Sequence, residues 1–348
     1  MNKIKKSTFY IKLTNWEYWP LYIANIPLFF IWLWFALRAR KLFFFSAVNP
    51  VIETGGMWGE SKYNILKRIP ESYLPKTIFV EKGSGIFFIK NKLAELKLEY
   101  PIIAKPDIGE RGTLVSKIEN EEGLINYLNK NNFNFLIQEF ISLPVELAVM
   151  HHRMPGQKEG RVTSICIKET LKITGDGKSS VRELMEENPR ARFQIDRFVK
   201  EFPNMLQIVP KDQQILELEP IGNHCRGTMF LNGNHHIDRE LIIAFNEVAS
   251  QMGHIYYGRF DLKCRSVEDI KNGKGFKIME YNGIGAEPAH IYDPSYPFIK
   301  KIQDIYSHWK IIYRIYKKQK KKGVRAMSIR EAIVRLKEYS NYQKSLAK

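Results

Sequence analysis

Two segments late in the chain place four polar side chains in the alternation expected of β-strands. They read "YYGRFDLKCRS" at 256–266 and "FKIMEYNGIGAEPAH" at 276–290. Arg259 and Asp261 are two residues apart and so project from one face of a strand, and Glu280 and Asn282 repeat that spacing. If the two strands pair in one sheet, the four groups converge on one patch. Carboxylate and amide oxygens are the ligands that Mg²⁺ prefers, so the pattern favours a metal and phosphate site.

The middle of the chain alternates strand-like and helix-like segments, which predicts an α+β fold with several hairpins. The 348 residues are 44% hydrophobic, enough for a large core and about two domains. A helix is expected over 121–130, and Ser180 with Glu183 forms a capping box that starts another. His151 and His152 are expected at the surface or in a turn. The predicted strands are "YPIIAKP", "GTLVSKI", "FLIQEFI", "VELAVMHHRM" and "RVTSICIKE".

A glycine-bearing loop separates the first two of these strands, in the order "IIAKPDIGERGTLV". Gly109 and Gly112 allow backbone conformations in which loop amides approach anionic oxygens, and Lys105 adds a point charge at the strand end. The same pattern also suits an ordinary hairpin turn. The GxxxxGK[ST] order of a Walker loop is absent.

The positive charge of the chain is concentrated at its two ends. The formal charge is +17, of which residues 1–41 contribute +6 and residues 300–348 contribute +12, leaving −1 for the middle. A nucleic-acid enzyme needs basic groups along its working groove, and here they lie outside the segment that carries the motifs. The distribution therefore favours an anionic membrane surface over nucleic acid as a partner. Three cysteines without CxxC spacing also argue against a disulfide scaffold or a structural zinc site.

The N-terminal segment is apolar and aromatic. Residues 18–37 carry no charge and are long enough to span a bilayer, but Pro20, Asn25 and Pro27 interrupt a single helix. We interpret this region as two short segments, broken near Pro27, that lie in or dip into the membrane; whether 18–37 spans or lies on the bilayer stays open. The alternative is a helix buried in a protein core. No signal-peptide pattern is found, so the expected location is cytoplasmic, at the inner face of the membrane.

The C-terminal segment has helical periodicity. A helix is predicted to end at Gly323, and a second starts after Ser328, with Glu331 completing a capping box. Such a basic amphipathic helix either lies on a membrane or docks on a protein core. Five apolar residues share one face of the first helix: Ile302, Ile305, Trp309, Ile312 and Tyr316.

Taken together, these motifs resemble the ATP-grasp superfamily, in particular D-alanine:D-alanine ligase and the ATP-grasp part of cyanophycin synthetase. The resemblance runs from about Ser61 to Pro294, through "AKPDIGERG", "QEFISLPVE", "ITGDGKSSVREL", "GRFD" and "MEYN". It implies an ATP-grasp fold, in which two α+β subdomains grip ATP, with an apolar N-terminal segment and a basic helical tail. The implied boundaries are 1–60, 61–298 and 299–348.

The resemblance also implies a role for individual residues. Lys105, Gly109, Gly112 and Lys168 would contact ATP phosphates, Glu139 the adenine amino group and Glu146 the ribose. Asp261, Glu280 and Asn282 would hold two Mg²⁺ ions, with Mn²⁺ as an alternative, and Arg259 would stabilise the transferring phosphoryl group. Either Lys62 or Lys67 would supply a further lysine. The candidates for an acceptor pocket are His224, Arg226, Glu287 and His290.

The activity implied is that of a ligase that joins a carboxylate to an amine, or to another nucleophile, through an acyl phosphate and releases ADP and phosphate. Together with the membrane-seeking ends, it suggests a membrane-presented substrate. The residues after the metal motif, "GIGAEPAHIYDP", differ from those of D-alanine:D-alanine ligase. This difference argues against D-alanyl-D-alanine as the product. Two alternatives remain: a soluble amino-acid or peptide ligase, and a membrane adaptor that binds MgATP without turnover.

Overall fold

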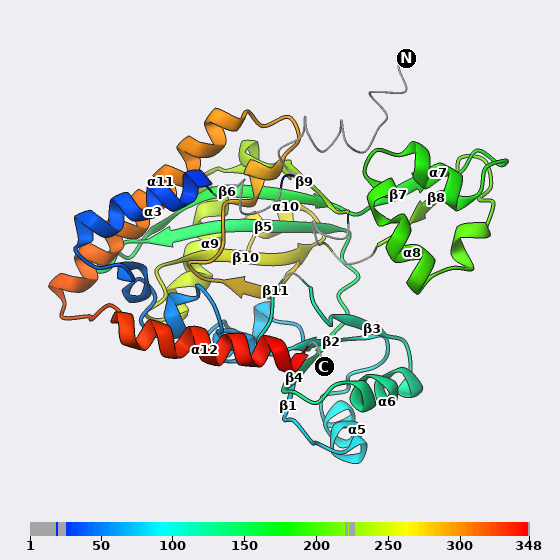
Figure 1. Cartoon of the computed structure of the whole chain (residues 1–348), viewed down its shortest axis with the longest axis horizontal. Coiled ribbons are helices and arrows are strands. Elements are labelled where there is room, and N and C mark those ends of the chain that lie inside the picture. The colour runs from blue at the N-terminus through cyan, green and yellow to red at the C-terminus, as the bar shows by residue number, and fades with distance from the viewer. Residues whose placement is uncertain (1–18, 20–25, 111, 220–221, 223–226, 347–348) are drawn as a thin grey trace.

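Two antiparallel sheets, each with its own helices, form the body of the protein (Figure 1). A computed structural model describes residues 19, 26–110, 112–219, 222 and 227–346, and the account below concerns these residues. The larger sheet has the strand order β11-β10-β5-β6-β9. Its strands are β5 (Val145–Arg153), β6 (Gly160–Glu169), β9 (Met229–Asn232), β10 (Tyr257–Cys264) and β11 (Phe276–Asn282). The mixture of helices with antiparallel sheets confirms the predicted α+β class.

The larger sheet packs one face against helix α9 (Arg239–Gln251), whose first turn is capped by the side chain of Asp238. Leu241, Phe245 and Val248 lie on one side of this helix, at spacings of three and four residues, and are fully buried against the strands. The short helix α10 (Val267–Lys271) connects β10 to β11. This packing makes the larger sheet a rigid platform for the residues at 259–261 and 280–282.

The smaller sheet has the order β1-β4-β2-β3 and forms a lobe with two helices. Its strands are β1 (Thr77–Val80), β2 (Ile102–Pro106), β3 (Ser116–Ile118) and β4 (Phe135–Glu139), and its helices are α5 (Ile86–Glu95) and α6 (Glu121–Lys130). Helix α6 coincides with the expected range of 121–130. The loop between β2 and β3 carries the predicted glycines. Helix α4 (Lys62–Leu66) precedes the lobe and contacts β11.

A third unit stands to one side of the larger sheet, between β6 and β9 in the chain (Figure 1). It consists of the hairpin β7 (Lys172–Thr174) and β8 (Ile215–Glu217) with helices α7 (Val181–Glu187) and α8 (Ile195–Glu201). The Ser180 side chain accepts from the Glu183 amide, and the Glu183 carboxylate accepts from the Ser180 amide. The predicted capping box is therefore confirmed.

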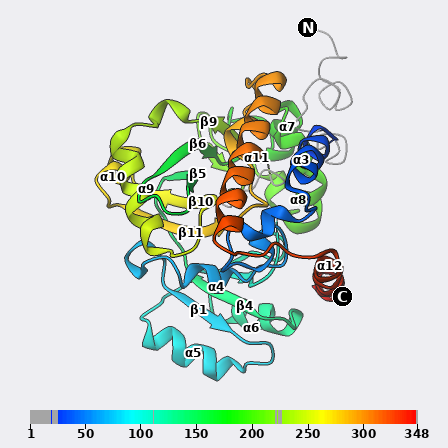
Figure 2. The same ribbon diagram turned by 90° about the vertical axis from the view of Figure 1, so that its left-hand side faces the viewer.

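On the other side of the body, helix α3 (Ile26–Ala39) lies along helix α11 (Phe298–Lys321), although the two are far apart in the sequence (Figures 1 and 2). Pro27 occupies the first turn of α3, where its missing amide hydrogen costs nothing. None of the helices among the described residues combines the length and the apolar character needed to cross a bilayer. The predicted segment before α3 falls, except for Trp19, outside the described residues.

The apolar face predicted for the C-terminal helix packs on protein. Ile305, Trp309, Ile312 and Tyr316 of α11 are buried against α3 and the short helix η2 (Phe44–Ala47). Gly323 follows the end of α11 with a φ of 83°, as expected for a helix end. Helix α12 (Ile329–Leu346) begins directly after the predicted cap, where the Ser328 amide donates to Glu331. It lies apart from α11, beside the smaller sheet (Figure 1).

The expectation that His151 and His152 lie at the surface is wrong. Both are buried, because β5 is the central strand of the larger sheet and both of its faces are covered. His151 Nε2 lies 3.0 Å from Asn246 Oδ1 on α9. Burial lowers the pKa of His151 to about 4 and that of His152 to about 3, so both rings are neutral at pH 7. Two adjacent histidines at the end of a predicted strand suggest a turn, but what covers a strand depends on segments that are distant in the sequence.

Candidate active site

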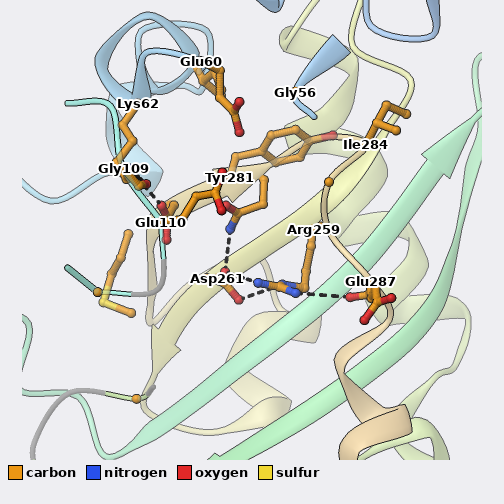
Figure 3. Close-up of a pocket in the computed structure, with 18 of the residues that line it drawn as sticks. Gly56, Glu60, Lys62, Gly109, Glu110, Arg259, Asp261, Tyr281, Ile284 and Glu287 are labelled. Carbon is orange, nitrogen blue, oxygen red and sulfur yellow. Dashed lines mark hydrogen bonds and ion pairs between the residues drawn. The ribbon is translucent and has the colours of Figure 1, made fainter. Parts of the chain in front are cut away.

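The four polar residues of β10 and β11 converge as the alternation predicts. The strands pair antiparallel, with Arg259 opposite Asn282 and Asp261 opposite Glu280. Arg259 donates from Nε to Asp261 Oδ1 at 3.1 Å and from a terminal nitrogen to Oδ2 at 3.0 Å. The Asn282 amide donates to Asp261 Oδ2 at 2.7 Å. Figure 3 shows these contacts around the Asp261 carboxylate.

Asp261 is a buried carboxylate compensated by two cations. Its second cation is Lys168 on β6, whose Nζ lies 3.4 Å from Oδ1. Burial acts to raise the pKa of Asp261, but Arg259 and Lys168 together outweigh it and hold the pKa below its usual value. Burial likewise acts to lower the pKa of Lys168, and the charges of Asp261 and Glu146 raise it instead. Asp261 and Lys168 are therefore both ionised at neutral pH.

Lys105 joins the two sheets. It extends from β2 of the smaller sheet, and its ammonium group donates to Gln138 Oε1 and to the backbone oxygen of Met279 on β11, each at 2.9 Å. Both acceptors are neutral, and Lys105 makes no ion pair with any of the described residues. Burial is the main reason that the pKa of Lys105 falls from 10.5 to about 8; Lys62 contributes, and Glu280 and Asp261 oppose it. A buried cation with neutral partners is a ready site for an anion.

The structure separates Lys62 from Lys67. Lys62, at the start of α4, points into the site, where its ammonium group donates to the Gly109 oxygen and lies 3.7 Å from Glu280 Oε1 (Figure 3). Lys67 turns away and lies 4.7 Å from the centre of the Tyr63 ring. The loop after β2 therefore closes on Lys62, which brings a lysine of α4 to the carboxylate of β11.

One cavity of about 670 Å³ between the two sheets is lined by all ten residues singled out above for ATP and metal binding. They are Lys105, Gly109, Gly112, Glu139, Glu146, Lys168, Arg259, Asp261, Glu280 and Asn282. Glu146 Oε1 pairs with Lys168 at 3.0 Å, and Glu139 accepts from the backbone amide of Lys76. A side chain at Gly222 would collide with the Glu146 carboxylate, so the chain at 222 runs directly over this group.

The candidates for an acceptor pocket have different positions. Glu287 lines the cavity, and its backbone oxygen accepts from Arg259 at 3.1 Å (Figure 3). His290 is buried, with Nδ1 at 2.7 Å from Ser164 Oγ and Nε2 at 3.1 Å from Asp304 Oδ2. His224 and Arg226 lie outside the described residues.

Sequence reasoning missed Glu60 as a residue of the cavity. Burial is the main cause that raises its pKa to about 7, and its buried Oε2 atom has no hydrogen-bond partner among the described residues. In Figure 3 the carboxyl group of Glu60 points toward the space around Tyr281. The local sequence "GMWGESK" contains no spacing that would have singled it out.

The segment that carries Glu60 is attached to the loop after β11. The amides of Ile284 and Gly285 donate to the oxygens of Gly55 and Gly56 at 3.2 and 2.7 Å. Gly56 has a φ of 82°, and a Cβ atom there would lie 2.7 Å from the Gly283 Cα. Two backbones can approach this closely only where glycines face each other. Residues 55–60 thereby form one wall of the site.

The donor set suits Mg²⁺ carried by a nucleotide better than a resident metal. Asp261, Glu280 and Asn282 are three oxygen-bearing side chains on two paired strands, and the described residues hold no cluster of three His, Cys, Asp or Glu that would bind an ion alone. Mg²⁺ typically uses one or two carboxylates and takes its other ligands from phosphate and water. The residues present therefore fit the group that the sequence motifs imply.

No family model matches the sequence, and no curated protein matches it. Among solved structures, the chain is similar to VanG D-Ala:D-Ser ligase from Enterococcus faecalis (13% identity, TM-score 0.40), covering 74% of this chain and 64% of that one. It is similar to D-alanine–D-alanine ligase from Bacillus anthracis complexed with ATP (14%, TM-score 0.41), covering 75% and 67%. It also matches a bifunctional glutathione synthetase from Pasteurella multocida (14%, TM-score 0.37), covering 70% of this chain and 35% of that one.

Proposed function

We propose that this protein is an ATP-dependent ligase that activates a carboxylate as an acyl phosphate and transfers it to an amine or a similar nucleophile. The observation that carries the proposal is the charge arrangement in the cavity. Lys62, Lys105, Lys168 and Arg259 face Asp261 and Glu280 there, and they come from helix α4 and from both sheets. A group of four cations around two carboxylates that could hold a metal suits a polyphosphate that arrives with a divalent ion.

Each of these residues has a part in the reaction that follows from its position. Lys105 and Lys62 bind the phosphates under the loop that carries Gly109 and Gly112. Asp261, Glu280 and Asn282 would hold a Mg²⁺ ion that arrives with ATP, and this ion would offset the charge of the phosphates. The substrate carboxylate attacks the γ phosphorus, the bond to the β-phosphate oxygen breaks, and ADP leaves. Arg259 stabilises the charge that develops in this step and again when the nucleophile attacks the acyl carbon. Phosphate then leaves as the amine loses its proton.

The test is nucleotide turnover by the purified full-length chain. ADP and phosphate release is measured with MgATP alone, with a membrane-lipid extract and with a mixture of amino acids, and hydroxylamine is added to trap an acyl phosphate as a hydroxamate. We expect release that depends on an added substrate and that Glu280→Gln abolishes. Glu268→Gln is the matched control, since Glu268 is an exposed glutamate of α10 that pairs with Lys271. It should turn over like the wild type.

The outcomes separate the candidate activities. Stimulation by lipid favours a membrane-presented substrate, and stimulation by amino acids alone favours a soluble amino-acid or peptide ligase. Nucleotide binding without turnover under every addition favours an adaptor that binds MgATP. Failure of the wild type to bind MgATP would contradict the proposal altogether.

The membrane part of the proposal is supported by the outer face of α3. Ile26, Phe29, Phe30, Trp34 and Leu37 share that face and are 51 to 66% exposed. Exposed basic residues lie at the end of α3 (Arg38, Arg40 and Lys41) and on the adjoining helix α11 (Lys310, Arg314 and Lys317). An apolar stripe flanked by lysine and arginine suits the interface of an anionic membrane at the inner face of the cell envelope.

Vesicle sedimentation tests the membrane part separately. We expect the protein to sediment with vesicles that contain phosphatidylglycerol and less with vesicles of phosphatidylcholine alone. The double variant Phe30→Ser and Leu37→Ser should lose this binding without losing stability, because both side chains are largely exposed. Phe87→Ser is the matched control, since Phe87 is 76% exposed on α5, in the smaller lobe far from α3 (Figure 1). Equal loss in the control, or no loss in the double variant, would refute a role for α3.

A further inference from the structure

The cavity that holds the charged residues continues into a second, apolar part. This apolar chamber is lined by Leu28 of α3, Met57, Ile284 and three residues of α11: Ile305, Trp309 and Ile312. Most of its wall comes from helices α3 and α11, and not from the strands that carry the charges. The polar part and the chamber form one continuous cavity between the larger sheet and these helices.

The wall that α11 gives to the chamber is buried. Ile305, Trp309 and Ile312 are only 2 to 8% exposed, although they line a cavity. Apolar side chains beside an empty space lose dispersion contacts, and each such space lowers the stability of a fold. Ala286 also lines the cavity, and a larger side chain at this position would fill part of the space. A hollow at this place therefore suits a ligand better than it suits the free protein.

The polar groups of the chamber are uncharged. Tyr257 and His308 both line it, and the Tyr257 hydroxyl lies 2.9 Å from His308 Nδ1. Burial lowers the pKa of His308 to about 4, so the ring is neutral at pH 7. The charged residues nearest to this pair in the cavity wall are Arg259 and Glu287 at the junction with the polar part, where Arg259 donates to the backbone oxygen of Glu287 (Figure 3). An ionic group would gain nothing in the chamber, whereas a hydrocarbon chain would regain the missing contacts.

We infer that one of the two substrates joined by this protein is an amphiphile whose hydrocarbon chain occupies the apolar chamber while its reacting head lies beside Arg259 and Glu280. The inference rests on the proposed ligase function and adds the substrate class. Two sources supply such a chain: a lipid of the bilayer, which would enter beside the exposed face of α3, and a free amphiphile in solution. The chemistry recognised by the chamber is the same in both.

The test uses Trp309 as a reporter, because a bromine atom quenches tryptophan fluorescence only at close range. The full-length chain is titrated with 11-bromo-1-undecanol below its micelle concentration, and the quenching attributable to Trp309 is the difference between the wild type and Trp309→Phe. Ala286→Phe is the blocking variant, and Ala286→Leu is a milder one should the first fail to fold. The binding of a non-hydrolysable MgATP analogue is measured in the same samples by calorimetry.

We expect quenching at Trp309 in the wild type and binding weakened about tenfold or more by the blocking variant, with nucleotide affinity retained. Absence of quenching at Trp309, or quenching that neither Ala286 variant weakens, would overturn the inference. If Trp309 of the wild type were quenched but the protein did not bind the MgATP analogue, the ligase function on which the inference rests would be contradicted instead. A second titration with vesicles of a phosphatidylcholine brominated in its chain separates the sources. Quenching at Trp309 that Ala286→Phe reduces identifies a bilayer lipid, and quenching by the free alcohol alone identifies a soluble amphiphile.

Discussion

Replacing Lys105 by methionine should weaken nucleotide binding without weakening the fold. The pKa of Lys105 is lowered from 10.5 to about 8, mainly by burial, so the folded protein disfavours the charged form. A shift of this size corresponds to about 3 kcal/mol of lost stability at pH 7, where the side chain is charged in both states. Lys105→Met removes this cost but leaves Gln138 Oε1 and the Met279 oxygen without their donor, which costs about 1–3 kcal/mol.

The balance of the two terms predicts a variant between unchanged stability and a gain of about 2 kcal/mol in the absence of nucleotide. Urea denaturation measures it, with and without a non-hydrolysable MgATP analogue. At a hundredfold excess over its Kd, the analogue should add about 2.7 kcal/mol to the wild type and nothing to Lys105→Met. A variant that loses more than about 2 kcal/mol without nucleotide, or that keeps the nucleotide effect, would show that Lys105 is a structural residue.

The same lysine predicts a pH dependence. Between the folded pKa of about 8 and the unfolded value of 10.5, the unfolded chain binds more protons than the folded one. The stability of the wild type should therefore rise with pH in this window, and at pH 7 the cost of the buried charge is fully present. Lys105→Met should lack this contribution to the rise, which denaturation at several pH values would measure as the difference between the two proteins.

Two further predictions concern the walls of the site. Gly56→Ala should lower the free energy of unfolding by about 2–3 kcal/mol and reduce ATP turnover, because its Cβ would collide with the backbone after β11. Gly253→Ala is the control: Gly253 has a φ of 71° but open space around it, so this variant should lose about 1 kcal/mol and keep its turnover. If the two variants had equal effects in thermal unfolding and turnover assays, the close approach of the Gly56 and Gly283 backbones would be contradicted. Tyr339→Phe removes the hydrogen bond from α12 to Glu110 (2.7 Å) and should speed amide exchange over 107–115 about fivefold. Unchanged exchange would mean that α12 does not restrain this loop.

Local periodicity alone was enough to locate the polar strands. Because side chains alternate along a strand, Arg259 with Asp261 and Glu280 with Asn282 had to share a face wherever those strands lay. The capping box at Ser180 and the apolar face of α11 follow from the same kind of short-range rule. Such features depend only on residues a few positions apart in the chain, so they can be predicted from the sequence alone.

The tertiary structure decided which distant groups meet. The contact of Lys105 with the backbone of Met279 joins residues in two different sheets, and no spacing along the chain announces it. The choice of Lys62 over Lys67 depended on how α4 is oriented against β11. The helix α3, which composition had suggested for a membrane, also covers a chamber with its inner face, through Leu28. Whether an apolar side chain meets lipid, protein or a hollow depends on what packs opposite it, and only the folded chain contains that information.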